Sequence, residues 1–222
     1  MKSIFFSGLC LLLAAISGGA YAAGEDQQNQ NLLLVDENYT STVDQNALGQ
    51  ALAGEPSGGL SKAESEDLLY MVEEEKLAGD VYSALNDKWN LRVFSNIIQA
   101  ERTHEAAVKT LLTRYSLSDP TQDAGKFSNE TLQKLHDDLV VQGKSSEEQA
   151  LMVGAAVEEI DIKDLEERAS RTDRDDIQLV YANLKRGSEN HLKAFVNNLQ
   201  RLGVKYSPQY LSSEEYQAII GR

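Results

Sequence analysis

The sequence predicts an all-α protein built around four long helices, and three observations carry that prediction. Apolar residues recur at helical spacing over four stretches, roughly 62–87, 90–115, 145–169 and 173–202. No stretch of any length alternates apolar and polar residues with the period of two that a half-buried strand requires. Aromatic residues make up only 7% of the chain, which suits helices better than a β-sandwich.

The first two helices have recognisable ends. Ser61-x-x-Glu64 is a capping-box pattern, so a helix is expected to begin directly after Ser61. The second helix is expected to end near Tyr115, because Asp119-Pro120 cannot continue it. A long connection follows, in which Ser128 is expected to cap a short helix.

The last two long helices follow this connection. Ser145-x-x-Glu148 is a second capping-box pattern and opens the third helix. Asp173 or a neighbour caps the fourth helix, which Gly203 ends, and a short helix is expected near the end of the chain. A short connection, a long one and a short one give a four-helix bundle with the long crossover between helices 2 and 3. That order is the ferritin-like topology, here with short accessory helices.

The chain is expected to divide into three parts. Residues 1–22 resemble a secretory signal peptide, with Lys2, an apolar run and an Ala20-Tyr21-Ala22 cleavage pattern; a short membrane anchor is the alternative. Residues 23–60 are rich in polar residues and glycine and are expected to be a flexible linker. Residues 61–222 form the helical domain. Cleavage would remove Cys10, the sole cysteine, and would place the protein in the periplasm or the medium.

The balance of charge limits the partners. Acidic residues outnumber basic ones by 35 to 21, for a formal charge of −14. Nucleic acid and anionic membrane surfaces are excluded as partners, because the chain would be repelled by both. Metal cations, by contrast, would be attracted.

Polar groups that could bind metal fall on the apolar stripes of all four helices. Burying such groups costs free energy unless they are paired or bind metal. Glu73 and Glu74 are expected to point elsewhere and to be solvated. The inward residues, which we predict as metal ligands, are Glu75, Glu101, His104, Glu158, Asp161 and His191.

These residue types suit two cations held close together. Carboxylates from facing helices can bridge two metal ions, and neutral imidazoles complete the coordination of iron, manganese or zinc. Each residue alone has a simpler explanation: Glu-x-x-His occurs in helices by chance, and inward charges can pair with one another. His136 lies in the crossover helix and is assigned to the surface or to structure.

Four stretches resemble the DUF2202 family, a group within the ferritin-like, rubrerythrin-related superfamily. The resemblance covers about residues 61–221 and lies in these segments: Glu73-Glu-Glu-Lys-Leu-Ala-Gly-Asp-Val-Tyr82, Phe94-Ser-Asn-Ile-Ile-Gln-Ala-Glu-Arg-Thr-His104, Val157-Glu-Glu-Ile-Asp-Ile-Lys-Asp-Leu165 and Gly187-Ser-Glu-Asn-His-Leu-Lys-Ala-Phe195.

The resemblance implies a carboxylate-bridged dinuclear site, usually di-iron. Glu75 matches the helix 1 glutamate that stands seven residues before a tyrosine, here Tyr82, which is the candidate outer-shell donor. Glu101 with His104 matches the first Glu-x-x-His. The helix 3 glutamate and the histidine of the second motif match Glu158 and His191.

The sequence departs from the superfamily pattern at Ser188, where the second Glu-x-x-His should carry its glutamate. Asp161 could restore the missing charge, and Glu159 is a less well directed substitute. Related proteins often carry an additional iron domain held by four cysteines. Because no cysteine would remain after cleavage, electrons would have to come from a separate donor.

Three functions follow as hypotheses. The first is an exported di-iron or iron–manganese protein that oxidises Fe(II) or reduces peroxide, using dioxygen or peroxide as a small-molecule substrate. The second is a bundle that sequesters iron, zinc or manganese without turnover. The third is a structural bundle whose inward charges pair with one another. A homodimer is compatible with all three.

Overall fold

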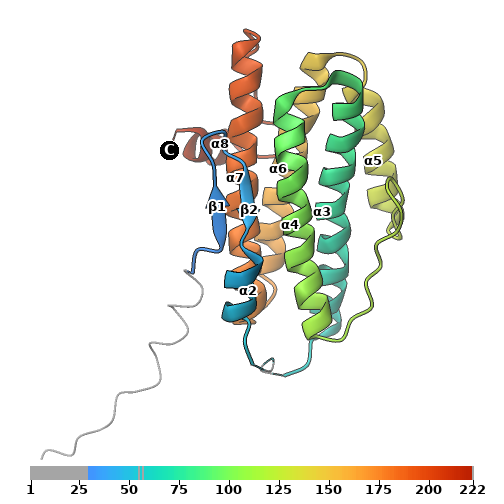
Figure 1. The fold of residues 1–222 in the computed structure, drawn as a ribbon, viewed down its shortest axis with the longest axis vertical. Helices are drawn as coiled ribbons and strands as arrows, with labels where there is room; N and C mark the ends of the chain where they lie inside the picture. The colour runs from blue at the N-terminus through green and yellow to red at the C-terminus, as the bar shows by residue number, and fades with distance from the viewer. Residues whose placement is uncertain (1–29, 55, 57, 222) are drawn as a thin grey trace, which may run out of the picture.

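The described part of the chain is mostly helical, as expected, and includes one small sheet (Figure 1). A computed structural model describes residues 30–54, 56 and 58–221, so the expected signal peptide lies outside the described residues. The long helices are α3 (Lys62–Trp89), α4 (Arg92–Arg114), α6 (Glu147–Ala169) and α7 (Asp175–Arg201). The shorter elements are α2 (Gln45–Ala51), α5 (Glu130–Gly143), α8 (Ser213–Ile220), β1 (Leu33–Val35) and β2 (Ser41–Val43).

The four long helices pack side by side, and two further elements cover opposite sides of them. Helix α3 packs along α4, and α6 packs along α7. Helix α5, in the crossover between α4 and α6, lies against α3 and α6. The hairpin of β1 and β2 lies against α4 and α7, across the molecule from α5 (Figure 1). We call these two flanks the hairpin side and the α5 side.

The starts of α3, α5 and α6 follow the expected capping chemistry with small shifts, whereas α7, expected to be capped by Asp173 or a neighbour, begins after Arg174 without a side-chain cap. Ser61 and Glu64 form the capping box that opens α3, as predicted. The caps of α5 and α6 are Asn129 and Ser146, each one residue after the predicted Ser128 and Ser145, and each side chain accepts hydrogen bonds from first-turn N–H groups. A run of consecutive polar residues offers several cap candidates, so local pattern alone leaves this choice open.

Part of the expected flexible linker is structured. Strands β1 and β2 pair antiparallel with Leu33 opposite Val43, and α2 follows directly. Leu32 and Leu48 are each 1% exposed and join an apolar cluster of the bundle. The expectation of a linker over 23–60 therefore does not describe residues 33–51. Strands of three residues are too short to give a readable alternating pattern.

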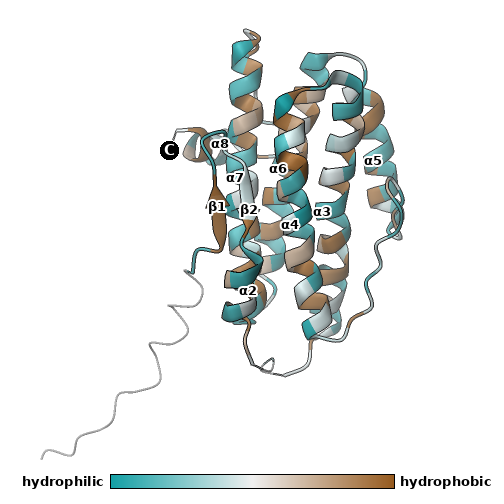
Figure 2. Ribbon diagram, viewed as in Figure 1, coloured by the Kyte–Doolittle hydropathy of each residue, from teal (hydrophilic) through white to brown (hydrophobic). Residues whose placement is uncertain are grey.

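Apolar and polar residues divide the interior into layers. Each long helix alternates apolar and polar faces in Figure 2. One apolar cluster surrounds Tyr82, Phe94 and Phe195, and a second surrounds Leu68 and Leu111. The predicted metal ligands fall between these clusters along the helices, so the bundle contains a polar layer enclosed by apolar ones.

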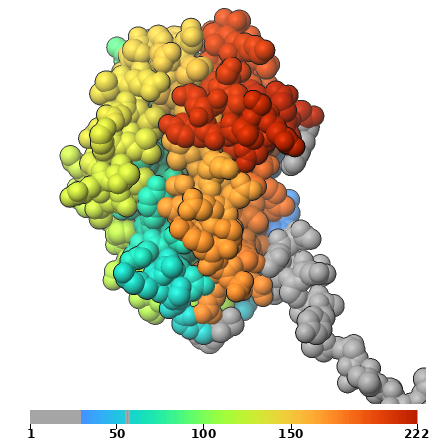
Figure 3. Space-filling view, turned by 180° about the vertical axis from the view of Figure 1, so that it is seen from behind, coloured from blue at the N-terminus to red at the C-terminus, as the bar shows by residue number. Residues whose placement is uncertain are grey.

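The segment after α7 closes one flank of the bundle, where it crosses the face seen in Figure 3. The carboxylate of Glu159 accepts hydrogen bonds from three consecutive backbone N–H groups, those of Gln209, Tyr210 and Leu211.

Among the described residues, no helix combines the length and apolar character needed to cross a membrane.

Candidate metal centre

All six predicted ligands are buried in the polar layer. Their exposed fractions are at most 5%, the largest being that of Asp161. Sequence periodicity placed each side chain on the inner stripe of its helix, and the structure directs each one inward. Three of the six, Glu101, His104 and His191, offer ligand atoms that all lie within 4.8 Å of one another.

Glu101 occupies the middle of this group. One of its oxygens, Oε1, lies 2.8 Å from Nδ1 of His191, and the other, Oε2, lies 3.2 Å from Nδ1 of His104. The two imidazole rings stack at a centroid distance of 5.3 Å. A carboxylate with one oxygen toward each imidazole has the arrangement needed to bridge two cations.

Glu75 and Glu158 add one carboxylate each, beside different histidines. Oε2 of Glu75 lies 3.4 Å from Nδ1 of His104, and Oε1 of Glu158 lies 3.7 Å from Nδ1 of His191. The residues therefore fall into two similar halves that share Glu101. Each half offers one imidazole, one carboxylate of its own and one oxygen of Glu101.

Asp161 lies beside Ser188, the residue of α7 that the sequence analysis singled out. The hydroxyl of Ser188 donates a hydrogen bond to Oδ2 of Asp161, and the carboxylate interacts electrostatically with Glu75 and Glu158. Ser188 is thus a positioning partner of Asp161. Asp161 lies outside the three-residue cluster and places a further carboxyl group beside it.

The cluster contains several buried polar atoms that lack hydrogen-bond partners. Several enclosed atoms have no hydrogen-bond partner in the described structure: both oxygens of Glu75, Oε1 of Glu101, Oδ1 of Asp161 and Nδ1 of His104 and of His191. The close approaches of Nδ1 to carboxylate oxygens lack hydrogen-bond geometry. Unpaired buried polar atoms are rare in folded proteins because they cost free energy. Oxygen and imidazole donors without partners fit divalent iron, manganese or zinc.

The carboxylates respond unequally to burial. Burial raises the pKa of Glu75 to about 7, although His104 lies beside it. Burial also raises the pKa of Glu101, but His191 and His104 outweigh burial and hold the pKa at about 2. Burial, together with the nearby carboxylates, raises the pKa of Glu158 and of Asp161. Glu101 is therefore the carboxylate of this group that most favours the ionised form, and burial disfavours ionisation of the other acids.

One residue of the hairpin contacts both histidines. Nε2 of His104 lies 2.9 Å from the carbonyl oxygen of Ser41 and donates to it, which leaves Nδ1 free to bind a cation. The N–H of Ser41 donates to Nε2 of His191 at 3.1 Å. Burial lowers the pKa of His191, but Glu101 and Glu158 raise it more. The Ser41 contact opposes full protonation of His191, because a proton on Nε2 would face another donor. In the metal-free chain His191 therefore carries its single proton on Nδ1, and this proton must leave and the Ser41 hydrogen bond to Nε2 must be given up before Nδ1 can bind a cation.

A glycine lets the helices approach closely at this point. A Cβ atom added to Gly187 would lie 2.6 Å from Cε1 of His104 and 2.8 Å from its Nε2. Real Cβ atoms essentially never approach other atoms this closely. Gly187 is thus required for the position of the His104 ring.

Tyr82 lies beside the centre, as expected. Its hydroxyl donates a hydrogen bond of 2.6 Å to Oε1 of Glu158, and its ring packs against Phe94 and Phe195. The hydrogen bond orients the Glu158 carboxylate toward the polar layer. Tyr82 therefore contacts the cluster through Glu158 and not through the histidines.

Three acids that the sequence analysis set aside are buried. Glu73 and Glu74, expected to be solvated, are 2% and 4% exposed. Glu73 accepts hydrogen bonds from the N–H groups of Ser128 and Asn129 at the start of α5. Glu159 serves the segment after α7 and is no substitute ligand. The acids were misjudged because α5 and the final segment cover helix faces that a simple bundle would leave in water.

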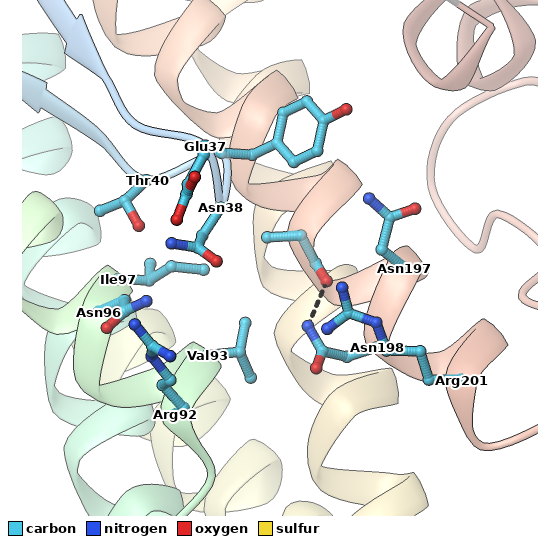
Figure 4. Close-up of a pocket in the computed structure, with 12 residues that line it drawn as sticks. Glu37, Asn38, Thr40, Arg92, Val93, Asn96, Ile97, Asn197, Asn198 and Arg201 are labelled. Carbon is cyan, nitrogen blue, oxygen red and sulfur yellow. Dashed lines mark hydrogen bonds between the residues drawn. The ribbon is translucent and has the colours of Figure 1, made fainter.

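Two other features lie apart from the centre. His136 packs against Phe127, and its Nδ1 lies 3.0 Å from Oδ1 of Asp137, as in a histidine with a structural role. A surface pocket of about 90 Å³ lies between the hairpin turn and the ends of α4 and α7 (Figure 4). Arg92 and Arg201 line it among several amide side chains, and a metal cation would not favour such a lining.

Comparisons with known proteins identify relatives of this chain. Residues 64–222 match the family described as "Uncharacterized protein domain (DUF2202)". Uncharacterized protein MJ0754 of Methanocaldococcus jannaschii is 48% identical over 167 residues, which cover 74% of this chain and 90% of the relative. A crystal structure of hypothetical protein MJ0754 from Methanococcus jannaschii superposes with a TM-score of 0.74 at 47% identity, covering 77% of this chain and 98% of that one.

Proposed function

Since the chain belongs to the DUF2202 family, we propose that it is a ferritin-like non-haem metalloprotein with a dinuclear carboxylate–histidine centre. The ions are iron in the first instance, and manganese or zinc is the alternative. The activity is oxidation of Fe(II) or reduction of peroxide, in an exported protein that receives electrons from a separate donor.

The position of Glu101 supports this proposal most directly. Its two oxygens lie 2.8 and 3.2 Å from Nδ1 atoms of two histidines on different helices, in the enclosed middle of the bundle. A purely structural bundle would pair these atoms by aligned hydrogen bonds. Here Oε1 and both Nδ1 atoms have no such partner.

The chain's residues have distinct tasks around such a centre. Two Fe(II) ions held by these residues would supply the two electrons that, with two protons, reduce one peroxide to two waters. Glu101 holds the two halves together, and Tyr82 orients Glu158. Glu75, whose pKa burial raises to about 7, holds a proton in the metal-free chain and releases it when a cation arrives. The apolar clusters on either side exclude bulk water.

Anaerobic reconstitution with Fe(II) tests the proposal. We expect about two iron ions per chain, and an absorption change on addition of peroxide or dioxygen. Replacing Glu101 and His104 together with alanine should abolish iron binding, because both halves lose a donor. His136→Ala is the matched control, since this histidine lies in α5 outside the centre and should leave iron binding intact.

Other outcomes would identify the alternatives. One ion per chain that is inert to peroxide would support sequestration, which the serine at position 188 favours because it removes one carboxylate. Failure of the native chain to bind iron, manganese or zinc would refute the metal centre and leave a structural bundle.

A further inference from the structure

A second group of acids lies next to the candidate centre, on the α5 side. Helices α3, α5 and α6 enclose a small cavity with six apolar side chains and two acids, Glu74 and Asp161, on its walls. Its volume is about 10 Å³, room for roughly one water-sized particle. The cavity is therefore too small for an organic ligand and large enough for one water or one cation.

Glu74 faces this cavity without a partner. Its side chain is buried, and neither carboxylate oxygen has a hydrogen-bond partner in the described structure. The same holds for Oδ1 of Asp161. The nearby Arg168 forms its ion pairs with Asp67 and Asp164 instead. Two buried acids with unpaired oxygens around one cavity form a site that a cation would stabilise.

The acids extend from the surface to the centre. Asp164 has a side chain that is 23% exposed, and it interacts with Glu74. Glu74 interacts in turn with Asp161, which interacts with Glu75 and Glu158 of the centre. Exposure thus falls from Asp164 to the two inner acids. On the hairpin side, by contrast, Ser41 occupies Nε2 of both histidines.

We propose that this cavity is a transit site for divalent cations, where Glu74 and Asp161 hold a cation on its way from Asp164 to the centre. The inference rests on the proposed function, because it assigns the route by which the centre is loaded. Carboxylate oxygens suit hard and borderline cations such as Mn²⁺ and Fe²⁺. A cation that has shed most of its water fits the available volume.

The rate of metal loading tests this route. Co²⁺ is mixed with the metal-free full-length protein, and absorption of the bound ion is followed by stopped flow. Glu74→Gln keeps the shape of the side chain and removes its charge, so loading should slow by about tenfold or more. The final number of ions per chain should stay unchanged. Glu66→Gln is the matched control, because it removes the same charge from an exposed position two turns earlier on α3.

Each other result has a definite meaning. An unchanged loading rate in Glu74→Gln would overturn the transit site and make Glu74 a neutral structural acid. A reduced final stoichiometry would overturn it too, by making Glu74 a ligand of the centre. If the native chain binds no Co²⁺ at all, the proposed function fails, and the route fails with it.

A second measurement needs no variant. In crystals of the native protein soaked in a large excess of Mn²⁺, we expect a weaker, partly occupied anomalous-scattering peak between the carboxylates of Glu74 and Asp161, besides those of the centre. The peak is weaker because a transit site binds more weakly than the centre and stays empty in solution once the centre is filled at low free metal. Peaks confined to the centre would contradict the proposal.

Discussion

The hairpin side and the α5 side cover the same polar layer in opposite ways. On the hairpin side, one residue, Ser41, contacts both histidines, and Gly187 brings α7 against the His104 ring. On the α5 side, Glu74 and Asp161 keep oxygens without partners around a cavity. The difference supports the proposal that the two flanks have different tasks, with the hairpin side fixing the imidazoles and the α5 side admitting cations.

The largest expected effect is a loss of metal affinity when a side chain is added at Gly187 on the hairpin side. Gly187→Ala places a methyl group 2.6 Å from Cε1 of His104, so the ring must move away from Glu101. We expect metal affinity to fall by about 100-fold, as for loss of ligand positioning in other metal sites. Titration calorimetry with Mn²⁺ measures the change.

Gly49→Ala is the control for this variant, because a Cβ there meets nothing within 4 Å. If Gly187→Ala kept its affinity, the hairpin side would not fix the histidines.

Weakening the attachment of α5 should lower the free energy of unfolding and raise the rate of metal loading. Glu73→Ala removes the acceptor of two N–H groups at the start of α5, which should cost about 2 kcal/mol of unfolding free energy. Because α5 covers the cavity, Co²⁺ loading should become faster while the final stoichiometry stays the same. Urea unfolding and stopped flow measure the two effects. Slower loading would mean that α5 does not limit access.

The stability of the metal-free protein should depend on pH through the same carboxylates. The pKa of Glu75 is raised to about 7 from an unfolded value of 4.5, so its contribution is complete below pH 4.5 and is lost as the pH rises through 7. Glu101, with a pKa lowered to about 2, loses its contribution only as the pH falls below 4.5. The change in Glu75 amounts to about 2–3 kcal/mol between pH 5 and 8, so we expect the Tm of the metal-free chain to fall by about 5–10 °C over this range.

Thermal melts of the metal-free chain and of Glu75→Gln measure this dependence. The variant should show a smaller fall over the same range, because it does not titrate. An equal fall in both proteins would place the titrating group elsewhere.

The smallest expected effect is a loss of stability on substitution of Tyr82, a residue that belongs to neither flank. Tyr82→Phe removes the hydrogen bond to Glu158 and keeps the ring between Phe94 and Phe195. We expect a loss of about 0.5–1 kcal/mol in stability, with metal stoichiometry unchanged. Calorimetric melts and metal analysis measure both, and loss of an ion would make Tyr82 essential to the half of the centre that contains Glu158.

Hydrophobic periodicity in the sequence predicted the features that are determined within a single helix. The four long helices and the inward directions of Glu75, Glu101 and His191 follow from spacing alone. The positions of Glu73, Glu74 and Glu159 depend on which other segments cover their helices, and spacing within one helix carries no information on that. The role of Ser41 depends on a contact 150 residues away along the chain.

The three consecutive glutamates of α3 restrict how this helix can change in length. Glu73 holds the start of α5, Glu74 faces the cavity and Glu75 faces the histidines. Successive residues of an α-helix are turned by about 100° about its axis. Deleting one residue ahead of Glu73 would therefore rotate all three glutamates away from the groups that they face now. Insertions and deletions should therefore be tolerated in the connections between helices and rejected within this part of α3.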